Sequence, residues 1–262
     1  MVEYNSLAFP RHVVTLDYLW GMPRDLGVLE MAAYPYGASL LMSKFLFDNI
    51  ELASFDKSNT EDMVSFTSKS DGKTYTYRQK NFNAETDPFP YKDKSFDLIV
   101  CCEMLEHLAM DPMHFFSEAN RILKDDGKLF LTTPNAVSSK YFIRMLNNKT
   151  PGICPHYRLP GVYENIYKRH NRELTPDEVK VFLNSGGFDI DYFETINLAE
   201  PPALGSFGRK KFSALYELLK DDIDNRRDTI VAMAVKAAGV RQRFPTSCDI
   251  YMEKDIARMR NI

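Results

Sequence analysis

Two apolar runs of β-strand length flank an amphipathic helical segment between residues 96 and 133, and this unit most restricts the fold. The first run, FDLIVCC, covers residues 96–102, and the second, KLFLTT, covers residues 128–133. Between them, residues 111–123 place apolar side chains at helical spacing after an Asp-Pro pair that is typical of a helix start. A strand, a helix and a strand in succession favour a parallel sheet.

The same alternation continues along the chain. Seven strands are predicted, over residues 26–32, 51–55, 73–82, 96–102, 128–133, 188–196 and 229–235. Four helices are predicted, over residues 38–47, 111–123, 175–185 and 213–219. We therefore expect an α/β fold: a doubly wound, mostly parallel seven-stranded sheet with helices on both faces.

A single domain over residues 1–262 is expected, because the chain has 262 residues and 44% of them are hydrophobic. Residues 1–24 are interpreted as an N-terminal cover of the sheet. Residues 136–172 have no sustained period and are interpreted as a lid-like insertion that binds substrate.

Charge and cysteine content exclude several classes of protein. The net charge of -3, from 33 basic and 36 acidic residues, argues against nucleic acid as a partner. Four cysteines without a CxxC pair predict neither a disulfide framework nor a metal site. No signal-peptide pattern and no run of membrane-spanning length is present, so a cytoplasmic protein without membrane contact is expected. The oligomeric state stays open.

Polar side chains follow the predicted strands at the edge where a doubly wound sheet binds ligands. The corner EMLEH, residues 103–107, follows strand 96–102. Asp56 ends the second strand and can accept both hydroxyls of a ribose, or can be a solvated strand end. Asn83 follows the third strand and suits an adenine edge or a turn. The first strand-to-helix turn, residues 30–37, lacks the G-x-G-x-x-G pattern of dinucleotide sites.

Two longer motifs add to these features. The run PFPYKDKSFDLIVCCEMLEHL precedes a strand that ends TTPN, and HNRELTPDEVKVFLNSGGFDIDYFE comes later. Over about residues 26–135 the chain resembles class I S-adenosylmethionine-dependent methyltransferases, especially the type-11-like group that acts on small molecules. The later run is similar to one in members linked to sugar and polysaccharide modification. The resemblance implies a Rossmann-like sheet and S-adenosyl-L-methionine as cofactor.

The resemblance also implies a set of cofactor-binding residues, namely Glu30, Ala32, Gly37, Asp56, Asn83, Ala84 and Glu103. Glu30 would lie under the cofactor beside the first turn, Asp56 would hold the ribose, and Glu103 would lie near the methionine end. Asn83 and its neighbour Ala84 would flank the adenine. Ala32 and Gly37 would be the small residues of the turn. The family usually has Gly where Ala32 and Ala33 stand, and the added methyl groups are expected to weaken cofactor binding.

Three residues are candidates for the acceptor side of the site. His107 is the candidate general base, because an oxygen acceptor of high pKa must lose a proton; the alternative is a packing or capping role. His170, in the polar segment 168–172, would bind a hydroxylated or acidic acceptor, or lie in a solvated loop. Asn135 would hydrogen-bond the acceptor or shape the turn before it.

The sequence therefore predicts a methyltransferase (EC 2.1.1.-) that methylates an oxygen of a small acceptor, most simply a sugar or sugar nucleotide of polysaccharide biosynthesis. A non-catalytic methyltransferase-like scaffold is the first alternative, motivated by Ala32-Ala33. An NAD(P)-dependent oxidoreductase is the second, and the missing glycine pattern counts against it.

Overall fold

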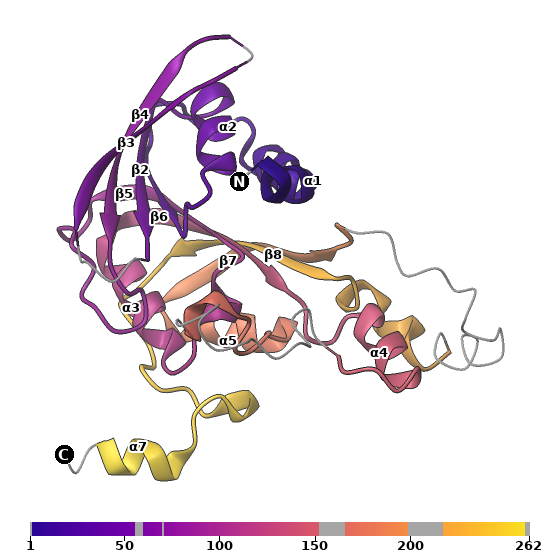
Figure 1. Ribbon diagram of the computed structural model, residues 1–262. Coiled ribbons are helices and arrows are strands. Elements are labelled where there is room, and N and C mark those ends of the chain that lie inside the picture. Colours follow the sequence, from indigo (N-terminus) through magenta and orange to yellow (C-terminus); the bar gives the residue numbers. More distant parts are fainter. Residues whose placement is uncertain (1, 56–59, 70, 152–165, 199–216, 260–262) are drawn as a thin grey trace.

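The computed structural model describes residues 2–55, 60–69, 71–151, 166–198 and 217–259. Its centre is an eight-stranded sheet with the order β3-β4-β2-β1-β5-β6-β8-β7 (Figure 1). The strands are β1 Gly27–Met31, β2 Asn49–Ser54, β3 Glu61–Thr67, β4 Thr74–Asn81, β5 Phe96–Cys102, β6 Leu123–Pro134, β7 Phe188–Ile196 and β8 Thr229–Lys236. Strands β4, β2, β1, β5 and β6 pair in parallel, whereas β3 and β8 run antiparallel to their neighbours.

Helices cover both faces of this sheet, with α1 and α2 on one side and α3 and α5 on the other (Figure 1). The helices are α1 Val2–Leu19, α2 Gly37–Phe45, α3 Pro112–Ile122, α4 Ser139–Leu146, α5 Pro176–Ser185 and α7 Glu253–Met259. Short 3-10 turns are η1 Leu105–His107, η2 Ile166–Lys168, η4 Lys220–Asn225 and η5 Ser247–Asp249. The predicted doubly wound α/β fold is confirmed.

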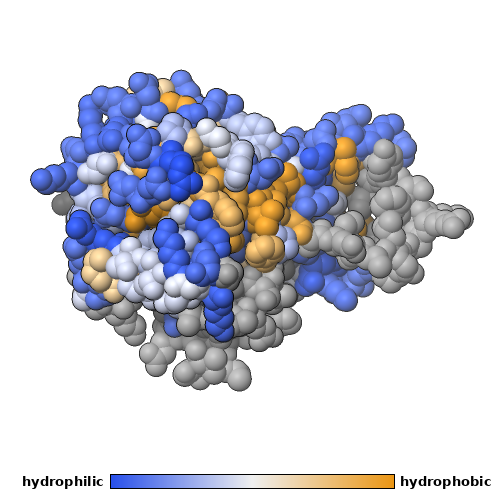
Figure 2. Space-filling view, turned by 90° about the horizontal axis from the view of Figure 1, so that it is seen from above, coloured by the Kyte–Doolittle hydropathy of each residue, from blue (hydrophilic) through white to orange (hydrophobic). Residues whose placement is uncertain are grey.

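The core has two apolar clusters, one on each face of the sheet. On the first face, Phe116 of α3 stacks on Phe182 of α5 with ring centroids 5.4 Å apart. On the second face, Leu19 of α1 and Met42 of α2 are fully buried against the strands. Hydrophobic side chains also gather in the middle of the face seen from above, among hydrophilic ones (Figure 2). No helix within the described residues is long and apolar enough to cross a membrane.

Helices α5 and α3 begin differently. Helix α5 starts with a capping box: the Thr175 hydroxyl accepts from the Glu178 amide at 3.2 Å, and the Glu178 carboxylate accepts from the Thr175 amide at 2.7 Å. In α3 the N-cap residue Asp111 makes no side-chain cap. Its carboxylate pairs instead with Arg243, and the Glu85 carboxylate accepts from the amide of Asp111.

The sheet differs from the prediction in β3, which makes eight strands where seven were expected. In residues 61–67, Val64 and Phe66 alternate as half-buried apolar side chains, but the other five residues are exposed, so the apolar pattern is short. Residues 61–67 are held by antiparallel pairing with β4 along their whole length. Strand β6 is also longer than predicted and includes residues 123–127, which contain an irregularity: Asp126 has a φ of +60°, and the register with β5 shifts there.

The region predicted as a lid contains helix α4 and turn η2, and its residues 152–165 lie outside the described part of the chain. The helix predicted over residues 213–219 also lies mostly outside it. The role of the 136–172 region as a lid and the division into one domain stay predictions.

Candidate functional site

A cavity of about 510 Å³ opens at the carboxyl ends of β1 and β5. These two strands are adjacent, and the chain continues from β1 toward β2 on one side and from β5 toward β6 on the other. Ligands bind at such a switch point of a doubly wound sheet. The wall is formed by residues from β1 and the turn after it, from the ends of β2, β4 and β5, and from α1 and η2. A volume of this size suits a small molecule.

The first turn of the site is formed by residues with positive φ. Ala32 has a φ of +54° and Tyr36 a φ of +70°, and α2 begins at Gly37. A left-handed conformation costs a residue with a Cβ about 1–2 kcal/mol, which explains why glycine is the favoured residue here. Both predicted small residues, Ala32 and Gly37, line the cavity.

Glu30 lies near the end of β1 in the cavity wall, with 6% of its surface exposed. Its Oε2 atom has no hydrogen-bond partner among the described residues. Burial raises the pKa of Glu30 to about 8, because water no longer stabilises the carboxylate. The site therefore holds a buried acid whose charged form needs a cation that the protein itself does not supply.

Residues of helix α1 line one wall of the cavity, and the sequence did not predict which residues these are. Arg11 Nη1 donates to Glu103 Oε2 at 2.6 Å, and Thr132 donates to the other oxygen of Glu103 at 3.1 Å. His12 also lines the cavity; burial, and then the nearby Arg11, lower its pKa to about 4, and its Nε2 has no partner in the described structure. Arg11 and Thr15 are spaced so that both lie on one face of a helix, and this spacing was the sequence signal that could have identified them.

The predicted adenine side is only partly described. Asn83 and Ala84 line the cavity, while Asp56 lies outside the described residues. The Asn83 Oδ1 atom accepts from the Glu85 amide at 2.9 Å, so this residue shapes a turn as well as the wall. Phe55 and Tyr167 also line the cavity, with their rings edge to face at 5.1 Å.

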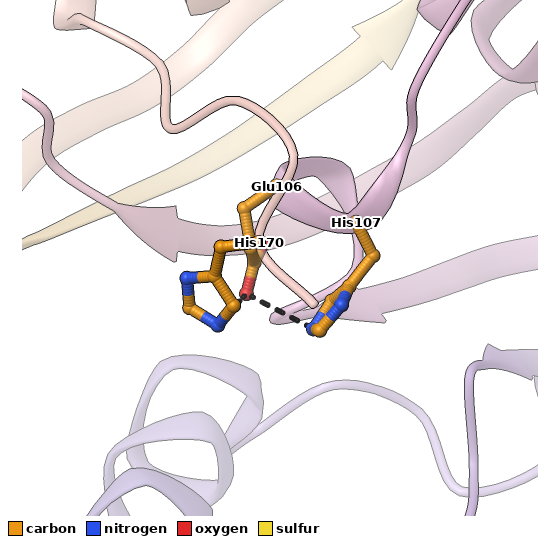
Figure 3. A group of neighbouring side chains, drawn as sticks. All are labelled: Glu106, His107 and His170. Atoms are coloured by element: carbon orange, nitrogen blue, oxygen red, sulfur yellow. Dashed lines mark ion pairs between the residues drawn. The ribbon is translucent and has the colours of Figure 1, made fainter. Parts of the chain in front are cut away.

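Next to the cavity, Glu106, His107 and His170 lie together, and Figure 3 shows the Glu106 carboxylate between the two imidazole rings. The ring centroids are 4.9 Å apart. Of the three residues, His107 lines the cavity itself. Burial, and then His170, lower the pKa of His107, so its ring is neutral at pH 7. Burial, and then the nearby Glu103, raise the pKa of Glu106.

Asn135 is not placed in the cavity wall. Its side chain is fully buried and donates to the carbonyls of Asn225 and Arg227 at 2.8 and 2.7 Å, and it accepts from the Val137 amide at 3.1 Å. The side-chain amide of Asn135 therefore hydrogen-bonds to three backbone groups. These contacts hold the turn after β6, and a role of Asn135 toward the acceptor stays a prediction.

Comparison with known proteins agrees with this geometry. Residues 50–131 match the profile of a family described as a methyltransferase domain. The ubiquinone biosynthesis O-methyltransferase of Methylococcus capsulatus is 28% identical over 145 residues, which cover 52% of this chain and 52% of that protein. The chain thus spans about half the length of this curated relative.

Solved structures share the fold at low sequence identity. A SAM-dependent methyltransferase from Archaeoglobus fulgidus superposes with a TM-score of 0.54 at 15% identity, covering 88% of this chain and 94% of that one. The [4+2]-cyclase SpnF superposes with a TM-score of 0.50 at 15% identity, covering 88% and 81%. Since one of these proteins is named as a cyclase, the fold alone does not specify the reaction.

Proposed function

We propose that this chain is a class I S-adenosylmethionine-dependent methyltransferase, and that it transfers the methyl group of S-adenosyl-L-methionine to an oxygen atom of a small acceptor. The observation that carries the proposal is Glu30. A buried carboxylate with one unpartnered oxygen in a cavity at the switch point suits a ligand with positive charge. S-adenosylmethionine carries a sulfonium and an ammonium group.

The residues present fit this cofactor. Glu30 would hold its positive end, and the turn from Ala32 to Gly37 lets the ligand approach the main chain at the start of α2. Asn83 and Ala84 would flank the adenine, with Phe55 and Tyr167 offering apolar faces. The bound cofactor supplies an activated methyl group, so alignment of the acceptor accounts for much of the rate.

A hydroxyl acceptor must also lose a proton, and the cluster of Glu106, His107 and His170 is the candidate group for this step. The Nδ1 atom of His107 lies 3.0 Å from the Arg169 carbonyl, which can only accept, so Nδ1 carries the hydrogen. The Nε2 atom of a neutral ring is then free to interact with the acceptor. His107 reaches the cavity, and His170 supports it from behind.

For the acceptor we infer a sugar or glycan precursor. The relative from Methylococcus capsulatus is named as an O-methyltransferase, which supports oxygen as the methylated atom. The sugar class rests on the run at residues 170–194, similar to one in polysaccharide-modifying members, and on aromatic residues such as Tyr167 near the cavity. A polyol or sugar-nucleotide acceptor is therefore the first class to assay.

Isothermal titration with S-adenosylmethionine and S-adenosylhomocysteine tests the proposal. We expect saturable binding by the wild-type chain and at least about tenfold weaker binding by Glu30→Gln. Glu253→Gln, an exposed change in α7, is the matched control and should bind as the wild type does. A Kd above about 1 mM for the wild type would contradict the proposal.

A non-catalytic scaffold is the second candidate, favoured by the alanines of the first turn, where Ala32 has a positive φ. It predicts a folded chain that binds partners without methyl transfer to sugars or sugar nucleotides.

The oxidoreductase alternative is tested by the change in melting temperature on adding NAD(P). It requires a shift with NAD(P) and none with S-adenosylmethionine.

A further inference from the structure

We propose that Glu106, His107 and His170 bind one divalent first-row metal cation, with Zn²⁺ as the reference ion, beside the cavity. Two imidazoles and one carboxylate form a donor set that suits Zn²⁺, Mn²⁺ or Fe²⁺ and leaves coordination positions for water or substrate. The sequence predicted no metal site, because these donors are not in one short motif. The catalytic use of the site rests on the proposed function, whereas metal binding does not.

The three donor atoms converge on one small volume. Glu106 Oε1 lies 3.9 Å from His107 Nε2 and 4.0 Å from His170 Nε2 (Figure 3). All three atoms lie within 4.8 Å of one another. Donors about 2.1 Å from a tetrahedral cation lie about 3.4 Å apart. The distances between donors must therefore shorten by about 0.5 to 1.4 Å, which rotation of the two imidazole side chains can supply.

Both imidazoles are oriented by a partner on the opposite ring nitrogen. His107 Nδ1 lies 3.0 Å from the Arg169 carbonyl oxygen, and His170 Nδ1 lies 3.1 Å from Glu173 Oε1. A carbonyl or an ionised carboxylate accepts but does not donate, which assigns the hydrogen to Nδ1 in each ring and the lone pair to Nε2. Histidines that ligate metals have this arrangement, with Nδ1 donating to a carbonyl or carboxylate.

Glu106 provides an independent observation. Its side chain is 1% exposed, and Oε2 accepts from the Thr133 hydroxyl at 3.0 Å. Its Oε1, which faces the two Nε2 atoms, has no hydrogen-bond partner among the described residues. A buried carboxylate oxygen and two imidazole lone pairs repel one another unless a positive charge lies between them. A metal cation supplies that charge, and a shared proton is the competing explanation.

The backbone holds the ligands in place. Glu106 and His107 lie on η1 directly after β5, and the segment with His170 is tied to η1 by hydrogen bonds. The Asn171 amide donates to the Glu106 carbonyl at 2.7 Å, and the Asn171 side chain donates to the His107 carbonyl at 2.7 Å. A ligand set on a rigid frame of this kind loses little entropy when it binds a cation.

In the proposed reaction a bound cation would lower the pKa of the acceptor hydroxyl, so that its proton passes to solvent. The alkoxide oxygen then forms a bond to the methyl carbon, and the carbon–sulfur bond breaks with its electron pair left on sulfur. With the cation bound, His107 would be a metal ligand, and this role would replace the general-base role proposed for the metal-free site. His107→Gln and removal of the metal should therefore reduce the rate of methylation alike.

Metal binding is tested on the full chain after treatment with a chelator. We expect Zn²⁺ to bind with a stoichiometry near one in isothermal titration, and Co²⁺ to give the visible absorption bands of imidazole ligation. His170→Ala and Glu106→Gln should weaken Zn²⁺ binding more than about 100-fold, since loss of even an outer partner of a ligand costs 10–100-fold. His114→Gln, a histidine on α3 outside the cluster, should leave Zn²⁺ binding unchanged.

Absence of saturable Zn²⁺ and Mn²⁺ binding to the wild type, with S-adenosylmethionine still bound, would overturn the metal site and leave the proposed function standing. That result would favour a proton shared between Glu106 and the two histidines. Zn²⁺ binding without S-adenosylmethionine binding would support the metal site and overturn the proposed function. If His170→Ala does not fold, the Co²⁺ spectrum of the wild type decides, because absence of imidazole ligation contradicts the proposal.

Discussion

Replacing Glu30 by Gln should remove a pH dependence from the stability of the ligand-free protein. Glu30 lies near the end of β1, has 6% of its surface exposed, and leaves Oε2 without a partner in the described structure. Burial raises its pKa from 4.5 to about 8. The folded chain therefore holds a proton on Glu30 over a pH range in which the unfolded chain has released it.

The sign and size of the effect follow from this difference in pKa. The contribution of Glu30 to stability is complete below about pH 4.5 and is lost as the pH rises toward about 8. Each pH unit in this window costs about 1.4 kcal/mol, so the wild type should lose about 3 kcal/mol by pH 7 from this group. Gln has nearly the same shape and no charge, so the variant does not lose this stability.

Urea unfolding of both proteins between about pH 5 and pH 8 measures the effect. All other titrating groups are common to both proteins, so the difference in the free energy of unfolding isolates Glu30. We expect the variant to gain about 1.4 kcal/mol on the wild type with each pH unit. Saturating S-adenosylmethionine should restore stability to the wild type and much less to the variant. A difference that does not change with pH would refute the reasoning.

Four further substitutions probe other parts of the structure by urea unfolding. Ala32→Gly relieves a φ of +54° and should stabilise the protein by up to about 1 kcal/mol, with tighter cofactor binding; a destabilised variant contradicts this. Asn135→Ala leaves three backbone groups unpaired and should cost about 2–3 kcal/mol, while S-adenosylmethionine binding by the folded fraction persists. Gly187→Ala places a Cβ 2.4 Å from the Gly239 carbonyl at a φ of +91° and should cost more than about 2 kcal/mol. Gly21→Ala, at a φ of +86° in open space, should cost only about 1 kcal/mol; equal costs for the two glycines would contradict the steric argument.

Much of the fold is readable from contiguous residues. Strands β5 and β7 have the bounds that their apolar runs predict, and α5 starts at its capping box. These signals are local, because strand period and helix capping depend on residues a few positions apart. The position of the candidate site at the carboxyl ends of β1 and β5 can also be predicted from the sequence, since parallel strands present their ends at one edge of the sheet.

Other features were decided by contacts between distant segments. Strand β3 is mostly exposed, with only Val64 and Phe66 half-buried, and its pairing with β4 holds it in the sheet. Arg11 reaches Glu103 across 92 residues, and Asn135 is held by carbonyls 90 and 92 residues away. No local pattern marks such pairs, because their geometry depends on the packing of the whole chain.

The cluster of Glu106, His107 and His170 shows most clearly which features follow from the sequence and which depend on the tertiary structure. The sequence by itself determined that the Glu-His pair follows β5 at the ligand-binding edge, because the apolar run before it forms the strand. Only the tertiary structure decided that His170 faces the same pair, through hydrogen bonds that tie its loop to η1. The reason is that a strand is specified by the period of its own side chains, whereas a site is specified by where separate segments meet.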